Sequence, residues 1–285
     1  MVSKYFFLLE RVKKMNELLK CPVCNEGLRQ GNKSFRCINN HSFDLAKEGY
    51  LNLLLNAKKT AGDSKEMMEA RRTFLSRGYY QELSDRVNHH LNLISKPNDS
   101  LVDIGCGEGY YLSRFQKNYR PQSHSYYGLD ISKLGVRMAA KKNPDINWLV
   151  ANFAKLPFID HSIHIVLSMF AEYSVPEIDR ILSSDGHILI VRAAPNHLVE
   201  LKNIIYPEIH EKAKKSAIKT FPGFEVIRDH YHYRTKIQST EDLLSLLLMT
   251  PHYWKIKPEG IENLKKYDSL EVTISIEIDL LKCIK

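Results

Sequence analysis

Three cysteines and a histidine near the start of the chain have the residue types and the spacing of a metal site. Cys21 and Cys24 are separated by two residues, and twelve residues later Cys37 and His41 are separated by three. Thiolates and imidazole are ligands that Zn²⁺ accepts in a tetrahedral arrangement. Because four protein ligands leave no open position, the pattern predicts a structural rather than a catalytic zinc. Chance clustering is the alternative, and the paired spacing argues against it.

The segment around these ligands is too short to bury a sizeable core, so a metal would supply much of its folding energy. Gly27 and Gly31 lie between the ligand pairs, where they suit a hairpin that returns the chain to Cys37. The chain holds 5 unevenly distributed cysteines, an odd number. In a cytosolic protein such a cluster indicates metal binding before disulfides.

The stretch LVDIGCGEGYYL, which begins at residue 101, has the composition of a ligand-binding loop. Gly105, Gly107 and Gly109 follow an apolar run, and Asp103 completes the pattern D-x-G-x-G-x-G. Glycine lets a backbone approach a ligand closely. A nicotinamide- or flavin-binding G-x-G-x-x-G would need glycine where Tyr110 stands, and the lysine of a phosphate-binding P-loop is missing. A plain tight turn is the remaining alternative.

Alternating strands and helices follow this loop. Apolar segments predict the strands LVDIG, SYYGLDIS, INWLVANF, SIHIVLSMF and GHILIVRAAP. Helical stretches separate them, for example over residues 133–142 and 175–182. This order predicts a doubly wound parallel sheet, which binds ligands beyond the carboxyl ends of its strands. An earlier helical segment, over residues 64–94, has a capping residue at Ser64 and a break at Gly78.

Length and composition describe an ordinary globular protein with a basic surface. The 285 residues are 44% hydrophobic and 26% charged, and their formal net charge is +8. This charge favours anionic partners such as nucleic acid, although a solvated surface explains it equally well. The apolar run over residues 5–9 is too short for a signal peptide or a membrane span, and no later segment is long enough. We therefore predict a cytoplasmic protein without a membrane partner.

The glycine loop and the strands after it resemble class I S-adenosylmethionine-dependent methyltransferases. In that family the loop, here with Asp103 and Gly105, passes the methionine end of the cofactor. An acid at the end of the second strand binds the ribose hydroxyls, and Asp130 stands there, 21 residues after the last glycine of the loop. Asn152 and Phe153, after the third strand, match the positions that contact the adenine. The segment LPFIDHSIHIVLS extends the resemblance into the fourth strand.

A closer resemblance covers most of the chain. The cysteine-rich segment, followed by HSFDLAKEGYLNLLL, GDSKEMMEARRTFL, VDIGCGEGYY and MTPHYW, is similar to the 23S ribosomal RNA (guanine-N1)-methyltransferases. The similarity runs from about Met15 to the end of the chain. It implies zinc ligation by Cys21, Cys24, Cys37 and His41, and cofactor contacts from Tyr80, Gly107, Glu108 and His197. Without it, Tyr80 would be interpreted as a core aromatic and His197 as a residue at a helix start.

The segment after the fourth predicted strand departs from this family. The family tends to have Ala-Pro there, whereas MFAEYS places Glu172 after Ala171. Guanine N1 carries a proton at neutral pH, so a base or a hydrogen bond at O6 should assist its methylation. Glu172 is a weak candidate for that base, and a surface glutamate at a helix start is the plainer interpretation.

A target base must leave its stack to be methylated, and aromatic side chains can then stack on it. The candidates are Tyr231, Tyr233, Tyr253 and Trp254. The alternation of the first two also fits one face of an ordinary strand, which we favour. The zinc module, with Arg29, Lys33 and Arg36, is expected to extend the RNA surface, and a structural cap or a dimer contact is the alternative.

We predict an α/β fold, a Rossmann-like class I methyltransferase domain with a small N-terminal zinc-binding domain. The expected division is a leader (1–14), a zinc module (15–52), a helical connector packed on the main domain (53–98) and the methyltransferase domain (99–285). The predicted activity is methyl transfer from S-adenosyl-L-methionine to N1 of a guanine in a loop of 23S ribosomal RNA, with zinc as a second cofactor. The alternatives are a small-molecule methyltransferase and a zinc-dependent RNA-binding protein without catalysis. A homodimer would suit a long RNA surface.

Overall fold

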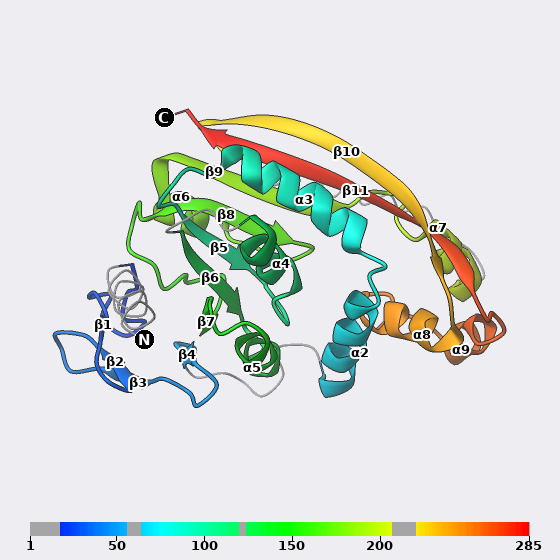
Figure 1. Cartoon of the computed structure of the whole chain (residues 1–285), viewed down its shortest axis with the longest axis horizontal. Helices are drawn as coiled ribbons and strands as arrows, with labels where there is room; N and C mark the ends of the chain where they lie inside the picture. Colours follow the sequence, from blue (N-terminus) through cyan, green and yellow to red (C-terminus); the bar gives the residue numbers. More distant parts are fainter. Residues whose placement is uncertain (1–17, 56–63, 120–123, 207–220, 285) are drawn as a thin grey trace.

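The structure is a computed structural model that describes residues 18–55, 64–119, 124–206 and 221–284 (Figure 1). The predicted leader over residues 1–14 lies outside these ranges. Within them, no helix combines the length and the apolar character that crossing a membrane requires.

The described residues form a central eight-stranded sheet with the order β10-β11-β9-β8-β5-β6-β7-β4. The strands from β4 to β9 pair in parallel, whereas β11 runs antiparallel to both of its neighbours, β9 and β10. Their bounds are Tyr50–Asn52 (β4), Ser100–Ile104 (β5), Ser125–Asp130 (β6), Asn147–Val150 (β7), Ile163–Met169 (β8), Leu182–Ala193 (β9), Phe224–Ile237 (β10) and Leu270–Cys283 (β11). Because β5 pairs with β6 on one side and β8 on the other, the strand order reverses beside the glycine loop. The predicted doubly wound parallel sheet is confirmed, and two long antiparallel strands extend it.

Helices flank this sheet and gather at one of its ends. Helices α3, α4 and α5 pack against β9, β6 and β7 and lie on the same side of the sheet in Figure 1. Helices α2, α7, α8 and α9 gather at one end of the sheet, where α2 and α9 each contact α8 and α7 contacts α9. The bounds are Lys65–Ser76 (α2), Gln81–Ile94 (α3), Tyr110–Tyr119 (α4), Lys133–Lys142 (α5), Val175–Ile181 (α6), Val199–Ile205 (α7), Thr240–Leu248 (α8) and Pro258–Leu264 (α9).

The predicted signals of the first helical segment are confirmed. The Ser64 hydroxyl accepts a hydrogen bond from the Met67 N–H, which caps the start of α2. Gly78 has a φ of 85° in the break between α2 and α3, a conformation that favours glycine. Strand β5 is buried along its whole length, as expected of a parallel strand covered on both faces.

The N-terminal segment folds into a small antiparallel sheet and then enters the large one. Its strands are Arg29–Gln30 (β1), Ser34–Arg36 (β2) and Ser42–Asp44 (β3), and the next strand, β4, pairs with β7. Leu19 and Phe35 share a hydrophobic cluster with Phe158 of the main domain. The predicted module over residues 15–52 therefore includes a strand of the large sheet, and the domain limits themselves stay predictions.

Candidate functional site

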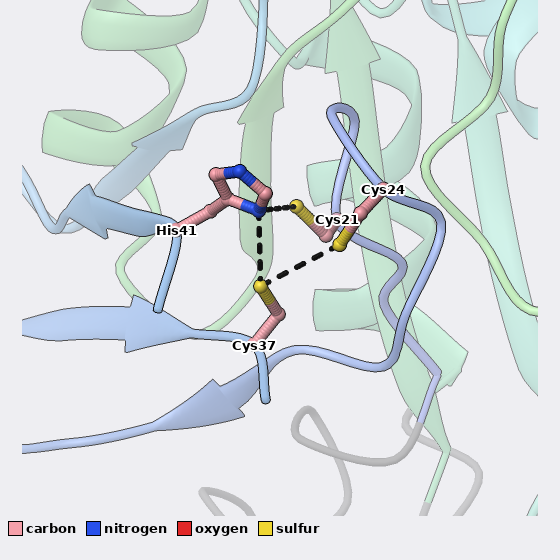
Figure 2. Close-up of side chains that lie close together, drawn as sticks. All are labelled: Cys21, Cys24, Cys37 and His41. Atoms are coloured by element: carbon pink, nitrogen blue, oxygen red, sulfur yellow. Dashed lines mark hydrogen bonds between the residues drawn. The ribbon is translucent and has the colours of Figure 1, made fainter. Parts of the chain in front are cut away.

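The four predicted metal ligands point toward one another (Figure 2), and their ligand atoms all lie within 4.8 Å of one another. His41 Nδ1 lies 3.6 Å from Cys21 Sγ and 3.3 Å from Cys37 Sγ. Cys24 Sγ lies 3.6 Å from Cys37 Sγ. A tetrahedron with zinc–sulfur bonds of about 2.3 Å separates its ligand atoms by about 3.5 to 3.8 Å. The donor set and its spacing therefore fit a structural zinc ion.

Two similar turns bring the ligand pairs together. Asn25 and Asn40 each donate a backbone N–H to the carbonyl of the first ligand of a pair, at 2.9 and 3.0 Å. Both have a left-handed conformation, with φ of 65° and 61°, which asparagine adopts more readily than most residues. A backbone hydrogen bond from Glu26 is the main cause that lowers the pKa of Cys24 to about 6. This shift favours the thiolate that binds metal.

The glycine loop connects β5 to α4 in a conformation that needs its three glycines. Gly105, Gly107 and Gly109 have φ of 76°, 54° and 78°. A Cβ on Gly105 would lie 2.4 Å from Cβ of Ala171, and one on Gly109 would lie 2.4 Å from the ring of Trp148. Both distances are too short for two carbon atoms. The loop therefore owes its shape to positive φ and to close packing on both sides.

Asp130 ends β6 and holds the loop from the neighbouring strand. Its Oδ2 accepts the N–H of Gly107 at 2.8 Å, and its Oδ1 accepts the N–H of Ser132 at 2.7 Å. These bonds fix the carboxylate beside the cavity that Asp130 lines, and a carboxylate oxygen can accept more than one hydrogen bond. The side chain can therefore receive hydroxyl groups of a ligand that lies over the loop.

Two buried acids lie beside the loop, each with one oxygen that has no hydrogen-bond partner in the described chain. Asp103 is 1% exposed, and burial together with the charge of Asp130 raises its pKa to about 8. Glu108 is equally buried, and its Oε2 accepts a hydrogen bond from Lys142 Nζ at 3.0 Å. Burial raises the pKa of Glu108 as well. Buried unpaired oxygens suit a cationic or hydrogen-bond-donating ligand, and the ammonium and hydroxyl groups of S-adenosylmethionine meet that requirement.

Tyr80 and His197 meet across the same site. The Tyr80 hydroxyl lies 3.5 Å from His197 Nε2, and the Ser275 N–H donates to His197 Nδ1 at 3.2 Å. Burial, with a smaller contribution from Lys202, lowers the pKa of His197 to about 4. The imidazole is therefore neutral at pH 7, and the bond from Ser275 assigns its proton to Nε2. In this arrangement His197 can donate a hydrogen bond from Nε2 and is not a base.

These groups surround a cavity of about 460 Å³, a size suited to a small ligand. The predicted residues that line it are Tyr80, Asp103, Gly105, Gly107, Glu108, Asp130 and His197. Asn152 and Phe153 do not line it, and the Asn152 side chain instead accepts the backbone N–H of Ala154 at 2.9 Å. Glu172 is exposed and does not line it either. For these three residues the proposed roles stay predictions.

Several lining residues were not predicted as cofactor contacts. They are Met68, Arg71, Leu75, Cys106, Tyr110, Tyr111, Ile131, Met169, Phe170, Ala171, Ala193, Ala194, Leu198, Lys202, Met249, Thr250, Pro251 and His252. The motif MTPHYW was the available signal for the last four. Its aromatic end does not supply the contact, since Trp254 does not line the cavity and is 68% exposed. Cys106, Tyr110 and Ile131 adjoin the predicted loop and Asp130, whereas Lys202 reaches the cavity through the packing of α7, which no local pattern in the sequence encodes.

Tyr231 and Tyr233 lie on β10, so the strand interpretation is confirmed. The Tyr231 hydroxyl donates to Glu82 at 2.6 Å, and the Tyr233 hydroxyl donates to the Tyr79 carbonyl at 3.0 Å. Both side chains therefore fasten β10 to the region where α3 begins, and neither lines the cavity.

Comparison with known proteins places this geometry in a family. The zinc-ribbon profile described as "RlmA, N-terminal" matches residues 19–61, and the profile "Methyltransferase domain" matches residues 101–186. The 23S rRNA (guanine(748)-N(1))-methyltransferase of Streptomyces fradiae is 32% identical over 250 residues, which cover 85% of this chain and 88% of that protein. The chain belongs to the 23S rRNA (guanine-N1)-methyltransferase family.

A second relative of this methyltransferase, the YxjB protein of Bacillus subtilis (strain 168), has a name that provisionally assigns it the 23S rRNA guanine-N1 activity. It is 29% identical over 273 residues, which cover 92% of this chain and 95% of that protein. The predictions of a Rossmann-like class I fold, of an S-adenosylmethionine-dependent methyltransferase and of an N-terminal zinc ribbon are confirmed. The roles of individual residues in the cavity stay predictions.

Proposed function

We propose that this methyltransferase transfers the methyl group of S-adenosyl-L-methionine to N1 of a guanine in a loop of 23S ribosomal RNA. The observation that carries the proposal is the similarity to the Streptomyces fradiae enzyme over 85% of the chain. The formal net charge of +8 adds support, because an RNA substrate is anionic. A cytoplasmic location belongs to this proposal, since ribosomal RNA is found there.

The cavity residues would divide the cofactor among them. Asp130 would accept hydrogen bonds from the ribose hydroxyls, and Asp103 would face the ammonium group. Arg71 Nη1 would lie 3.3 Å from a Cβ at Gly107, so its guanidinium is close enough to the loop to meet the carboxylate of the cofactor. Asn152 and Phe153 keep their predicted place beside the adenine, which would require the loop after β7 to move toward the cavity. When bound, the cofactor supplies an electrophilic methyl group on a sulfonium.

The protein's main task in such a transfer is alignment of donor and acceptor. A bond from guanine N1 to the methyl carbon forms while the bond from that carbon to sulfur breaks, and the N1 proton leaves for solvent or a base. His197 would line the site and donate a hydrogen bond, because its neutral imidazole carries its proton on Nε2. That Glu172 is the base stays a hypothesis. It would be refuted if the Glu172→Gln variant kept full activity while the Asp130→Ala variant was inactive.

Primer extension on modified RNA tests the activity directly. The purified protein is incubated with S-adenosylmethionine and unmodified 23S ribosomal RNA, and reverse-transcriptase stops are then mapped. N1 methylation removes a Watson–Crick donor, so we expect one new stop, one nucleotide before a loop guanine. The Asp130→Ala variant is the matched control and should give no stop.

Other outcomes separate the alternatives. Cofactor binding without any stop would favour a small-molecule substrate or a different RNA. RNA binding without cofactor binding would favour the non-catalytic RNA-binding protein. The proposal includes a homodimer, because two copies would suit a long RNA surface. The molecular mass from sedimentation, with and without RNA, would test it.

A further inference from the structure

Phe170 combines two unfavourable properties at the edge of the cofactor cavity. Its φ of 53° lies in the left-handed region, which is costly for a bulky side chain. The residue is also 42% exposed, although it lines the cavity. Backbone strain and exposed aromatic surface that coincide beside a ligand cavity indicate a functional constraint.

The surrounding structure holds Phe170 in this conformation from both sides. Its N–H donates to the Val191 carbonyl of β9 at 3.0 Å, just beyond the end of β8. The next residue, Ala171, is held by its carbonyl, which accepts the Ser168 hydroxyl at 3.3 Å. The Ala171 methyl group packs so closely against Gly105 that a Cβ there would lie 2.4 Å away. Phe170 therefore directly precedes a residue that packs against the glycine loop of the cofactor site.

Phe170 lines the same cavity as the glycine loop, and it is partly open to solvent. Its centroid is 5.8 Å from that of His197, with an interplanar angle of 36°. The other phenyl and phenol rings that line the cavity in the described chain, Tyr80, Tyr110 and Tyr111, are less exposed. Among these rings, Phe170 therefore offers the most exposed aromatic surface to a planar group that enters the cavity.

We propose that the ring of Phe170 is the stacking surface for the target guanine. This inference rests on the proposed RNA substrate, because an extruded base needs an aromatic or apolar face to replace its lost neighbours. The strained turn fixes the height of the ring relative to the cofactor loop. Phe170 is thus a positioning residue that sets the distance and angle between the base and the methyl group.

Four substitutions test the ring separately from the backbone. Phe170→Ala and Phe170→Leu remove the aromatic face, and we expect kcat/KM for RNA to fall by about 5- to 150-fold, the range that base–aromatic stacking supplies. Phe170→Tyr keeps the face and should remain close to wild type. Phe170→Gly also removes the ring, but glycine tolerates a positive φ. If Phe170→Ala folds poorly, Phe170→Gly should therefore show the same loss of activity without the loss of stability. Leu93→Ala, at a residue of α3 that is 67% exposed, is the control.

Cofactor affinity, measured by calorimetry in the absence of RNA, makes the result specific. We expect it to fall much less than kcat/KM for RNA in all four variants, because Phe170 is a partly exposed residue of the cavity lining. Full activity of Phe170→Leu, or a loss of cofactor affinity that matches the loss of activity, would overturn the inference. Wild-type protein that methylates no RNA would instead refute the proposed function, so the two failures are distinguishable.

Discussion

The N-terminal module (residues 18–49) and the sheet domain that follows it obtain their order in different ways. The strands of the module, β1 to β3, contain two or three residues each, whereas β10 and β11 contain 14 each. The module buries few large side chains, among them Leu19, Leu28 and Phe35. The sheet domain buries most of its strands and the inner faces of its helices. These differences indicate that a metal ion and contact with the sheet domain stabilise the module, while hydrophobic burial stabilises the sheet domain itself.

Loss of the metal should give the largest effect, and it should unfold the module while the sheet domain stays folded. Cys37→Ser, or chelation of zinc, is expected to abolish amide-exchange protection in residues 18–49 while β5 to β9 stay protected. The reason is the apparent binding energy of structural zinc, about 10–16 kcal/mol in small zinc domains. Exchange measured by mass spectrometry, with zinc content measured in parallel, checks this. Cys283→Ser is the control, since that thiol lies outside the cluster. Protection that survives chelation would mean that packing alone holds the module.

Glycine substitutions should affect the two regions unequally. In the sheet domain, Gly105→Ala introduces a 2.4 Å contact with Ala171 at a φ of 76°, whereas nothing lies within 4 Å of a Cβ at Gly27 in the module. Overpacking costs about 1–3 kcal/mol, and the loop can relieve it by shifting. Binding would then have to restore the loop, so we expect Gly105→Ala to lose cofactor affinity by up to roughly 5- to 150-fold. Gly27→Ala should bind the cofactor like wild type. Calorimetric titration with S-adenosylmethionine measures both, and equal affinities would show that the loop can relax.

The buried Asp103 carboxylate should lower the stability of the ligand-free protein at high pH, although it favours binding of the cofactor. Its pKa is raised from 3.8 to about 8, so folding takes up a proton and the ligand-free protein loses stability as pH rises between these values. Asp103→Asn removes this dependence, and its Tm should exceed that of wild type by a few degrees at pH 8.5 but hardly at pH 4. The same variant should bind the cofactor about tenfold or more weakly, since a neutral amide cannot form an ion pair with an ammonium group. A variant that is no more stable than wild type at pH 8.5 would show that the pKa of Asp103 is not raised in the folded protein.

The parts that the sequence predicted are those that local chemistry determines. The zinc ligands share two short turns, the three glycines share one loop, and Asp130 ends the adjacent strand, so spacing alone locates them. Lys202 and the segment Met249–His252 reach the cavity only through packing of α7 and α8, which periodicity does not specify. Phe170 directly follows the predicted fourth strand, but its left-handed backbone has no signal in the sequence. The pairing of β4 with β7 was missed for the same reason, because a three-residue strand has no pattern of its own.

The contact between the two regions offers the smallest and most selective test. Lys20 Nζ of the module lies 2.8 Å from Asp160 Oδ1 of the sheet domain, and Arg180 Nη1 lies 2.7 Å from the same oxygen. Hydrogen bonds from Lys20 and Arg180 lower the pKa of Asp160 to about 2. Lys20→Met should therefore destabilise the protein by less than about 1 kcal/mol, because the Asp160 side chain is 51% exposed and Arg180 still neutralises it.

Salt dependence shows whether that small effect is electrostatic. The difference in urea midpoint between wild type and Lys20→Met should shrink in 1 M NaCl, where the Debye length is about 3 Å. Methionine keeps an apolar stem like that of lysine, so a difference that persists would assign the loss to the short hydrogen bond between Lys20 Nζ and Asp160 Oδ1. In that case a local contact that salt does not screen, in addition to the burial of Leu19 and Phe35 beside Phe158, would hold the module to the sheet domain.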